Sequence, residues 1–376
     1  MSVLLLILGL MMFMGLVVVH EYGHYLAARR GGVDVEEFGI GFPPKAWGKK
    51  LASGMEFTIN WLPLGGFVRL KGEHDSATAK GSFGAAPLGV KVQVMIAGVL
   101  MNLLTAFALF TFLALIGLPK IIENQFTVGS DTKISNSRVL VGSIEKNSPS
   151  EKAGLKQRDQ ITRLTSDGKT YSIMSTDDLP KATKSLAGKD VVIDIVRDKK
   201  TSNLNAKLLS QAEVVASKKT NEPKGYLGIS PFELTMRRST WSAPIVAAGL
   251  IKQITIETMR ALGSMVGNAA RGNGSEASKQ VSGPIGIFVI LKDNSGLGIR
   301  FILMIIAVIS LTLAIMNALP IPALDGGRLY LTLFYRLIRK PLKQSTEEKV
   351  HGTGFVALMI LFVLITFVDV QRFIWK

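Results

Sequence analysis

The sequence predicts a polytopic α-helical membrane protein with four transmembrane helices, a re-entrant β-hairpin and one inserted α+β domain. Hydrophobic residues make up 48% of the 376 residues and charged residues only 19%. That balance is too apolar for an ordinary soluble protein and too polar for a purely membrane-embedded bundle. Apolar stretches at 3–28, 92–118, 301–319 and 354–371 are each long enough to span a hydrocarbon core about 30 Å thick. Between the second and third stretches, residues 120–235 are rich in charged and turn-forming residues, which predicts a soluble domain.

Composition narrows the chemistry and the partners. The chain has no cysteine, so disulfides, thiolate zinc sites and cysteine nucleophiles are excluded. Its formal net charge of +16 fits basic cytoplasmic loops and a basic domain next to anionic lipid. No basic stripe is interleaved with aromatic residues, so we expect the lipid bilayer as a partner and no nucleic acid.

The first apolar stretch is predicted to be a membrane span that ends at the cytoplasmic interface. Residues 3–19 are apolar and rise about 25 Å as a helix, which places His20 near the far edge of the hydrocarbon core. Arg29 and Arg30 follow and mark the interface. A cleavable signal peptide is the alternative, but the positively charged segment that begins such peptides is missing and the apolar run is long for one.

A metal-binding pattern, His20-Glu21-Tyr22-Gly23-His24, stands at the end of this span. Two histidines four residues apart lie on one face of a helix, about 6 Å apart, and can share one metal ion. Glu21 is then placed to act as general base on a water at that metal. A metal site at the inner end of a span indicates hydrolysis within the bilayer or at its edge.

A catalytic zinc needs a third protein ligand, and Asp325 is the residue that fits. Among the remaining histidines, His74 lies in a predicted cytoplasmic loop and His351 precedes the fourth span, and we interpret both as solvated residues. Asp369 lies near the outer end of the fourth span, at the wrong depth. The third span runs parallel to the first for 19 residues, about 28 Å, before the break that carries Asp325, so this carboxylate reaches the depth of His20. A role for Asp325 in capping the next helix is compatible with metal binding.

The other segments of the membrane part have simpler patterns. Residues 57–70 alternate apolar and polar side chains and turn at Leu64-Gly65-Gly66, which predicts a β-hairpin that is either a surface hairpin or a sheet edge facing substrate. Asn102 and Thr105 are the strongly polar residues of the second span, and we expect them to hydrogen-bond between helices. Residues 240–292 predict amphipathic interfacial helices with a flexible break at 272–275.

Loop charges predict the orientation in the membrane. The loop 29–91 carries nine Lys/Arg residues and the loop 336–349 carries five, so we expect both on the cytoplasmic side. The two termini and the domain at 120–235 are then extracytoplasmic, and the metal site faces the cytoplasm.

The inserted domain resembles a PDZ domain of the bacterial type. A strand at 139–144 is followed by "NSPSEKAGLKQRDQI", by strands at 160–164 and 190–197, and later by a loop that is similar to the carboxylate-binding loop of that family. The late position of this loop implies the circularly permuted form. The resemblance implies a groove for peptide C-termini, although a spacer that binds no peptide is the alternative. The loop residues that would form this groove are Tyr226, Leu227, Gly228 and Ile229.

The whole layout resembles the bacterial site-2 proteases, which are intramembrane zinc metalloproteases. The resemblance rests on His20-Glu21-x-x-His24, on "FTINWLPLGGFVRLKGE", on the PDZ-like insert and on "NALPIPALDGG" in the third span. It is closest to the regulator of sigma-E protease, with one PDZ domain in place of two. It implies one zinc ion per chain with His20, His24 and Asp325 as ligands and Glu21 as general acid and base. It also implies substrate-binding residues in the β-segment and in the broken span, namely Gly65, Gly66, Asn317 and Pro320.

The resemblance implies cleavage of transmembrane segments of single-span proteins in the bacterial plasma membrane, as in regulated intramembrane proteolysis of anti-sigma factors or remnant signal peptides. A non-catalytic PDZ-bearing membrane scaffold with a structural metal site is the main alternative. A transporter would predict inverted repeats, and the sequence has one broken helix and no repeat. The predicted parts are 1–118, which includes the β-segment at about 38–72, then 120–235, 236–297 and 298–376.

Overall fold

The computed structural model describes residues 2–122, 124–197, 200–217, 224–271 and 283–373 of the chain. It forms two compact units. The first comprises Met1–Ile116, Phe126–Val128 and Trp241–Lys376, and the second comprises Gly117–Gln125 and Gly129–Thr240. The second unit corresponds closely to the soluble domain predicted at 120–235.

Four helices of the first unit are long and apolar enough to cross a membrane: α1 (Ser2–Arg30), α2 (Leu88–Ile116), α9 (Ile299–Ala318) and α11 (Gln344–Phe373). Their count confirms the four predicted spans. Side chains such as Leu4 on α1, 70% exposed, lie on the outside of the unit, as expected for a lipid-facing surface. α11 begins ten residues before the predicted fourth span, because no helix breaker separates its polar first turns from its apolar part.

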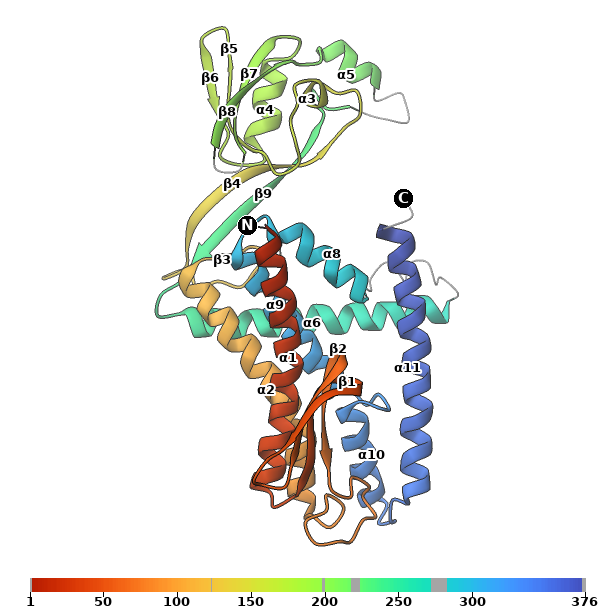
Figure 1. The fold of residues 1–376 in the computed structure, drawn as a ribbon. Helices are drawn as coiled ribbons and strands as arrows, with labels where there is room; N and C mark the ends of the chain where they lie inside the picture. Colours follow the sequence, from red (N-terminus) through yellow and green to blue (C-terminus); the bar gives the residue numbers. More distant parts are fainter. Residues whose placement is uncertain (1, 123, 198–199, 218–223, 272–282, 374–376) are drawn as a thin grey trace. The chain divides into compact units, whose positions relative to one another are not determined.

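Helix α2 packs against both α1 and α9, and Figure 1 shows α1 and α2 side by side. A glycine allows the close approach of α1 and α2. A Cβ atom at Gly23 would lie 2.6 Å from the carbonyl oxygen of Ala97, so only a residue without a side chain fits there. The motif glycine of α1 therefore has a packing role beside the two histidines.

The predicted hairpin within 57–70 is wrong in its pairing. The structure has two long strands, β1 (Val35–Lys50) and β2 (Glu56–Leu70), and the two halves of β2 do not pair with each other. Both halves pair with the first half of β1: Phe38 lies opposite Phe57 on one flank and opposite Val68 on the other. Alternation and a glycine turn indicated where strands and a reversal lie, but they do not specify which strand becomes the partner.

The third span, α9, is broken as predicted, and the next helix, α10 (Asp325–Leu337), begins at Asp325 itself. Two glycines let the helix start pack against the preceding loop. A Cβ atom at Gly326 would lie 2.2 Å from the carbonyl oxygen of Leu319, and one at Gly327 would lie 2.1 Å from that of Ile321. The sequence Asp-Gly-Gly thus fixes the turn that presents Asp325.

Two further helices, α6 (Ala243–Ala270) and α8 (Pro284–Ser295), occupy the region predicted to hold interfacial helices. The predicted break at 272–275 lies outside the described residues. Asp369 of α11 is fully buried, and its Oδ2 accepts hydrogen bonds from the backbone N–H groups of Gly283 (2.9 Å) and Gly286 (2.8 Å) at the start of α8. This carboxylate therefore satisfies a helix terminus.

The second unit is built on one sheet with the strand order β3-β9-β4-β5-β7-β8, and β6 pairs with β5. The strands predicted at 139–144, 160–164 and 190–197 are all present, and Ser148 caps α3 through its side chain, as its place before Pro149 predicts. Residues such as Val141, Leu164 and Ile193 form a buried core belonging to this unit. Its elements are β3 (Leu118–Pro119), β4 (Lys133–Ile144), α3 (Pro149–Lys152), β5 (Gln160–Ser166), β6 (Lys169–Ser172), α4 (Asp178–Ser185), β7 (Asp190–Arg197), β8 (Lys200–Lys207), α5 (Gln211–Ser217) and β9 (Ile229–Arg238).

Candidate metal centre

The side chains of His20, His24 and Asp325 meet inside the first unit. Asp325 Oδ2 lies 3.0 Å from His20 Nε2 and 3.2 Å from His24 Nε2, and the two Nε2 atoms are 3.2 Å apart. The histidines come from successive turns of α1, and the carboxylate comes from the first residue of α10. The residue before Asp325, Leu324, occupies the helix-cap position, so the Asp325 side chain faces the histidines.

The spacing of these three atoms fits a zinc ion. Zinc bonds to imidazole nitrogen and carboxylate oxygen are about 2.0–2.2 Å long, so two ligand atoms at a tetrahedral centre lie about 3.4 Å apart. The observed separations of 3.0–3.2 Å are close to that value. Across the residues that the structure describes, this is the cluster of histidine and acidic side chains able to hold a metal. Two histidines and one carboxylate are also the donor set of several catalytic zinc sites.

Residues of helix α2 contact the Nδ1 atoms of both imidazole rings. The Nδ1 atom of His24 lies 2.7 Å from the carbonyl oxygen of Val94, and Nδ1 of His20 lies 3.3 Å from Nδ2 of Asn102. Because the Val94 carbonyl can only accept, His24 donates from Nδ1 and keeps the lone pair of Nε2 for a metal.

Gly98 makes room for both rings on the same face of α2. A Cβ atom there would lie 2.4 Å from His24 Nε2 and 2.6 Å from His20 Cε1. The residues 94, 98 and 102 recur every four positions, which puts them on one stripe of the helix. Only Asn102 was singled out from the sequence, as an interhelical group, and the contact with His20 agrees with that expectation. The sequence does not specify that α2 packs against α1. The spacing of this stripe alone therefore does not identify Val94 and Gly98.

Strand β2 lies next to Glu21. A Cβ atom at Gly66 would be 3.3 Å from Cγ of Glu21, and the backbone of Val68 hydrogen-bonds to the Glu21 carboxylate. Gly65 has φ +151° and faces the ring of Phe42, which leaves no room for a side chain. Of the two glycines singled out in the sequence, Gly66 is the one beside Glu21, and Gly65 packs against Phe42.

A cavity of about 110 Å³ adjoins the centre. Its polar lining includes Glu21, His24, Glu73, Asp325 and Arg328. Such a volume holds a few water molecules at about 30 Å³ each. The arrangement thus places polar space beside the carboxylates of Glu21 and Asp325 and the ring of His24.

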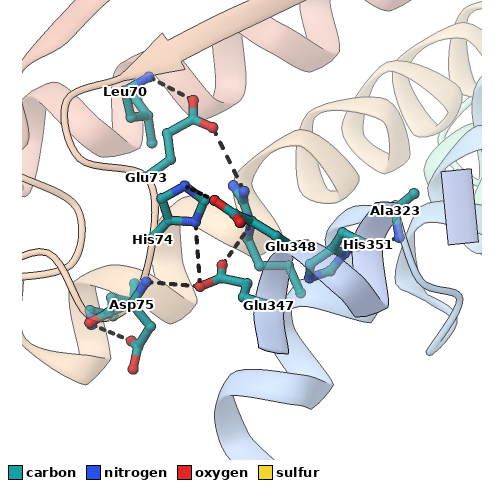
Figure 2. Close-up of polar contacts among 10 residues, drawn as sticks. Leu70, Glu73, His74, Asp75, Ala323, Glu347, Glu348 and His351 are labelled. Atoms are coloured by element: carbon teal, nitrogen blue, oxygen red, sulfur yellow. Dashed lines mark hydrogen bonds and ion pairs between the residues drawn. The ribbon is translucent and has the colours of Figure 1, made fainter. Parts of the chain in front are cut away.

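A polar cluster that the sequence did not indicate surrounds Glu347, at the start of α11 (Figure 2). Glu347 is only 2% exposed, its Oε2 accepts from the backbone N–H of Asp75 at 3.0 Å, and its Oε1 lies 3.7 Å from Arg328 Nε. Arg328 in turn lies 3.7 Å from Glu73. This cluster ties the loop after β2 to α10 and α11, close to the cavity.

The two histidines interpreted as solvated instead belong to this neighbourhood. His351 Nδ1 accepts a hydrogen bond of 3.0 Å from the backbone N–H of Ala323, a residue of the loop before Asp325 with φ +74°. His74 lies 3.5 Å from Glu348 (Figure 2). Neither histidine joins the metal cluster. His351 therefore supports the strained loop that presents Asp325.

The predicted substrate-binding residues of the third span lie near the break and make no described contact with the three ligand atoms. Asn317 donates from Nδ2 to the carbonyl oxygen of Leu313 at 3.1 Å, one turn earlier on α9. Pro320 is exposed in the loop that follows.

In the second unit, the loop before β9 carries the four residues proposed for a peptide groove. Leu227 and Gly228 are buried, Gly228 has φ +74°, and its carbonyl oxygen accepts from Ser150 Oγ at 2.9 Å. Tyr226 donates its hydroxyl to Gln211, and Ile229 begins β9 opposite Ile144. The backbone N–H of Gly225 donates to Glu145 at 3.3 Å, so this loop already holds a carboxylate of its own unit.

Comparison with known proteins gives a consistent result. The family model described as Peptidase family M50 matches residues 8–361. A Clostridium perfringens protein, named provisionally as a zinc metalloprotease, is 30% identical over 366 residues, covering 97% of this chain and 98% of its own length. A Fusobacterium nucleatum protein with the same kind of name is 30% identical, covering 98% and 96%. The regulator of sigma-W protease RasP from Bacillus subtilis is 27% identical, covering 96% and 97%.

Proposed function

This chain belongs to peptidase family M50 and is a multi-pass bacterial membrane protein and a zinc metalloprotease of the site-2 type, and we propose that it cuts the membrane-spanning segments of single-span proteins. The proposed ligands of its zinc ion are His20, His24 and Asp325. The observation that carries the proposal is the meeting of these three side chains, two from the apolar helix α1 and one from the first residue of α10, with Glu21 beside them.

Each residue of the centre has a part in peptide hydrolysis. When bound, zinc polarises the scissile carbonyl and lowers the pKa of a water molecule towards neutrality. Glu21 accepts the proton of the attacking water and passes it to the nitrogen of the leaving amine, so that the peptide bond yields a carboxylate and a free amine. The cavity beside Glu21 supplies the water to this carboxylate.

The β-segment is proposed to hold the substrate in an extended form. A transmembrane helix hides its carbonyl groups in its own hydrogen bonds, so the segment must open before it is cut. Residues 66–70 of β2 pair with β1 on one side only among the described strands. A substrate strand added to the other side would run past Gly66, which is in contact with Glu21. We assign Asn317 and Pro320 to the same substrate path, as the family resemblance implies.

The orientation proposed from the loop charges places the cut near the cytoplasmic face. It puts both termini and the second unit outside the cytoplasm, in the plasma membrane. The second unit then meets the extracytoplasmic part of a substrate, where its PDZ-like loop at Tyr226–Ile229 either binds a peptide terminus or limits the size of what approaches. Anti-sigma factors and remnant signal peptides are the substrate classes that this arrangement suits.

The position of the cut tests the proposal. The purified chain, reconstituted with zinc in lipid vesicles, is mixed with a single-span reporter protein, and the new ends are located by mass spectrometry. We expect one cut inside the apolar segment, within the third of it nearest the cytoplasmic end. Cuts confined to the soluble parts of the reporter would contradict intramembrane cleavage while leaving the protease activity itself intact.

A further inference from the structure

Asn102 of α2 stands behind one of the two histidines of the metal centre, and its side chain is incompletely satisfied. The residue is fully buried, and its Nδ2 lies 3.3 Å from His20 Nδ1. In the described structure its Oδ1 is buried without a hydrogen-bond partner. Burying an amide oxygen without a hydrogen-bond partner is unfavourable, so an amide held in this position calls for an explanation.

The two histidines have different partners at Nδ1. His24 faces the Val94 carbonyl, which is a pure acceptor and leaves Nε2 free for a metal. His20 faces an amide, which can either donate from Nδ2 or accept at Oδ1. In the structure, Asn102 Nδ2 donates to His20 Nδ1, so the ring proton of His20 is on Nε2 and is donated to the lone pair of His24 Nε2, which lies 3.2 Å away.

With a metal ion bound, the other ring nitrogen of His20 would have to carry the proton. Its Nε2 must then offer a lone pair, so the ring proton moves to Nδ1 and requires an acceptor. A half-turn of the Asn102 amide brings Oδ1 into the place of Nδ2, and no backbone movement is needed because the two ends of the amide have the same shape. The backbone of Asn102 is itself held, since Ser310 Oγ of α9 donates to its carbonyl oxygen at 2.8 Å.

We propose that Asn102 is a positioning residue for the zinc site, whose Oδ1 accepts the Nδ1 proton of His20 in the metal-loaded protein and so fixes that ligand's tautomer and ring orientation. The proposal rests on the proposed zinc ligands. It adds a residue of the second span that acts through His20 and does not touch the metal.

Zinc affinity of the solubilised full-length chain, measured by competition with a chromogenic chelator, tests this role. Loss of such a supporting partner typically weakens metal binding by about 10- to 100-fold. We expect Asn102→Leu, which has similar volume and no acceptor, to show a loss of that size. Asn102→Asp keeps the acceptor oxygen and is expected to bind zinc at least as tightly as the unmodified chain. Thr105→Val is the matched control: the interhelical hydrogen bond predicted for Thr105 is wrong, because in the described structure its hydroxyl donates to the Met101 carbonyl of its own helix.

The absorption of bound Co²⁺ gives a second readout, and the comparison separates the possible failures. The Asn102→Leu protein should show a Co²⁺ spectrum altered in its visible bands, and Asn102→Asp a spectrum of unmodified intensity. Equal zinc affinity for Asn102→Leu and the unmodified chain would overturn the proposal. If Asn102→Leu does not fold, weakened zinc binding by folded Asn102→Asp would overturn it as well. Loss of zinc binding in the unmodified chain, or its persistence in His20→Ala, would instead contradict the proposed ligand set.

Discussion

Three residues of α2 at a spacing of four, Val94, Gly98 and Asn102, surround the histidines of α1. Val94 and Asn102 contact the Nδ1 atoms of the two histidines. Gly98 has no side chain and so leaves room for both rings. This support comes from a neighbouring membrane helix, which packs close to α1 because Gly23 of α1 and Gly98 of α2 have no side chains at the contact.

Gly98→Ala should therefore weaken zinc binding. The added methyl group would lie 2.4 Å from His24 Nε2, so the ring must shift and the ligand atoms can no longer keep their spacing. We expect at least about a tenfold loss of zinc affinity, the size found for other changes around metal ligands. Gly89→Ala on the same helix is the control, since a Cβ atom there meets nothing within 4 Å. Equal affinities for the two variants would show that the close approach is unimportant.

At the scale of elements, α11 is joined to the loop after β2 through Glu347. This buried carboxylate accepts the N–H of Asp75 (Figure 2) and lies near Arg328, while its neighbour Glu348 is largely exposed. The same loop contributes Glu73 to the cavity beside Glu21. The fourth span thus helps to hold one wall of the centre.

Glu347→Ala is expected to loosen this loop. Hydrogen bonds to charged groups contribute about 1.5–3 kcal/mol, so local opening should become roughly tenfold more frequent or more. The exposed Lys80 in the loop offers a site for trypsin, and the rate of cutting there measures the opening. Lys349→Ala, at an exposed position of the same helix, should leave the rate within twofold of the unmodified chain. An unchanged rate in Glu347→Ala would show that other contacts fix the loop.

The elements differ in how far the sequence predicts them. The four spans follow from long apolar runs, and the meeting of Asp325 with His20 follows from equal depth along two parallel helices. The sequence does not predict that β1 pairs with both halves of β2. An alternating pattern specifies which side chains share a face of the strand, but it does not specify the partner strand. The Glu347 cluster escapes prediction for a related reason: Asp75 and Glu347 are 272 residues apart, and only the fold brings them together.

At the scale of the whole molecule, the chain consists of two units with separate cores. The core around Leu164 lies entirely within the second unit, whereas clusters around Val94 and around Ile302 stabilise the first. We therefore expect that the metal centre of the first unit and the sheet of the second can be altered separately.

Leu164→Ala tests this separation. Leu164 is fully buried, and such a truncation typically lowers the free energy of unfolding by about 2–5 kcal/mol. We expect the second unit to unfold at lower denaturant concentration while the zinc affinity of the full-length chain stays the same. The exposed Lys169→Ala on the same sheet should change neither. A fall in zinc affinity in Leu164→Ala would mean that the two units are coupled.

The central claim is that Glu21 performs the proton transfers at a zinc ion held by His20, His24 and Asp325. The measurement that tests it most directly is zinc content and reporter cleavage in one preparation of Glu21→Gln. The account predicts one zinc ion per chain, as in the unmodified protein, and a loss of cleavage by a factor of at least about 100, since general acid–base groups contribute about 10²–10⁴-fold. Cleavage at the unmodified rate with zinc in place would contradict it.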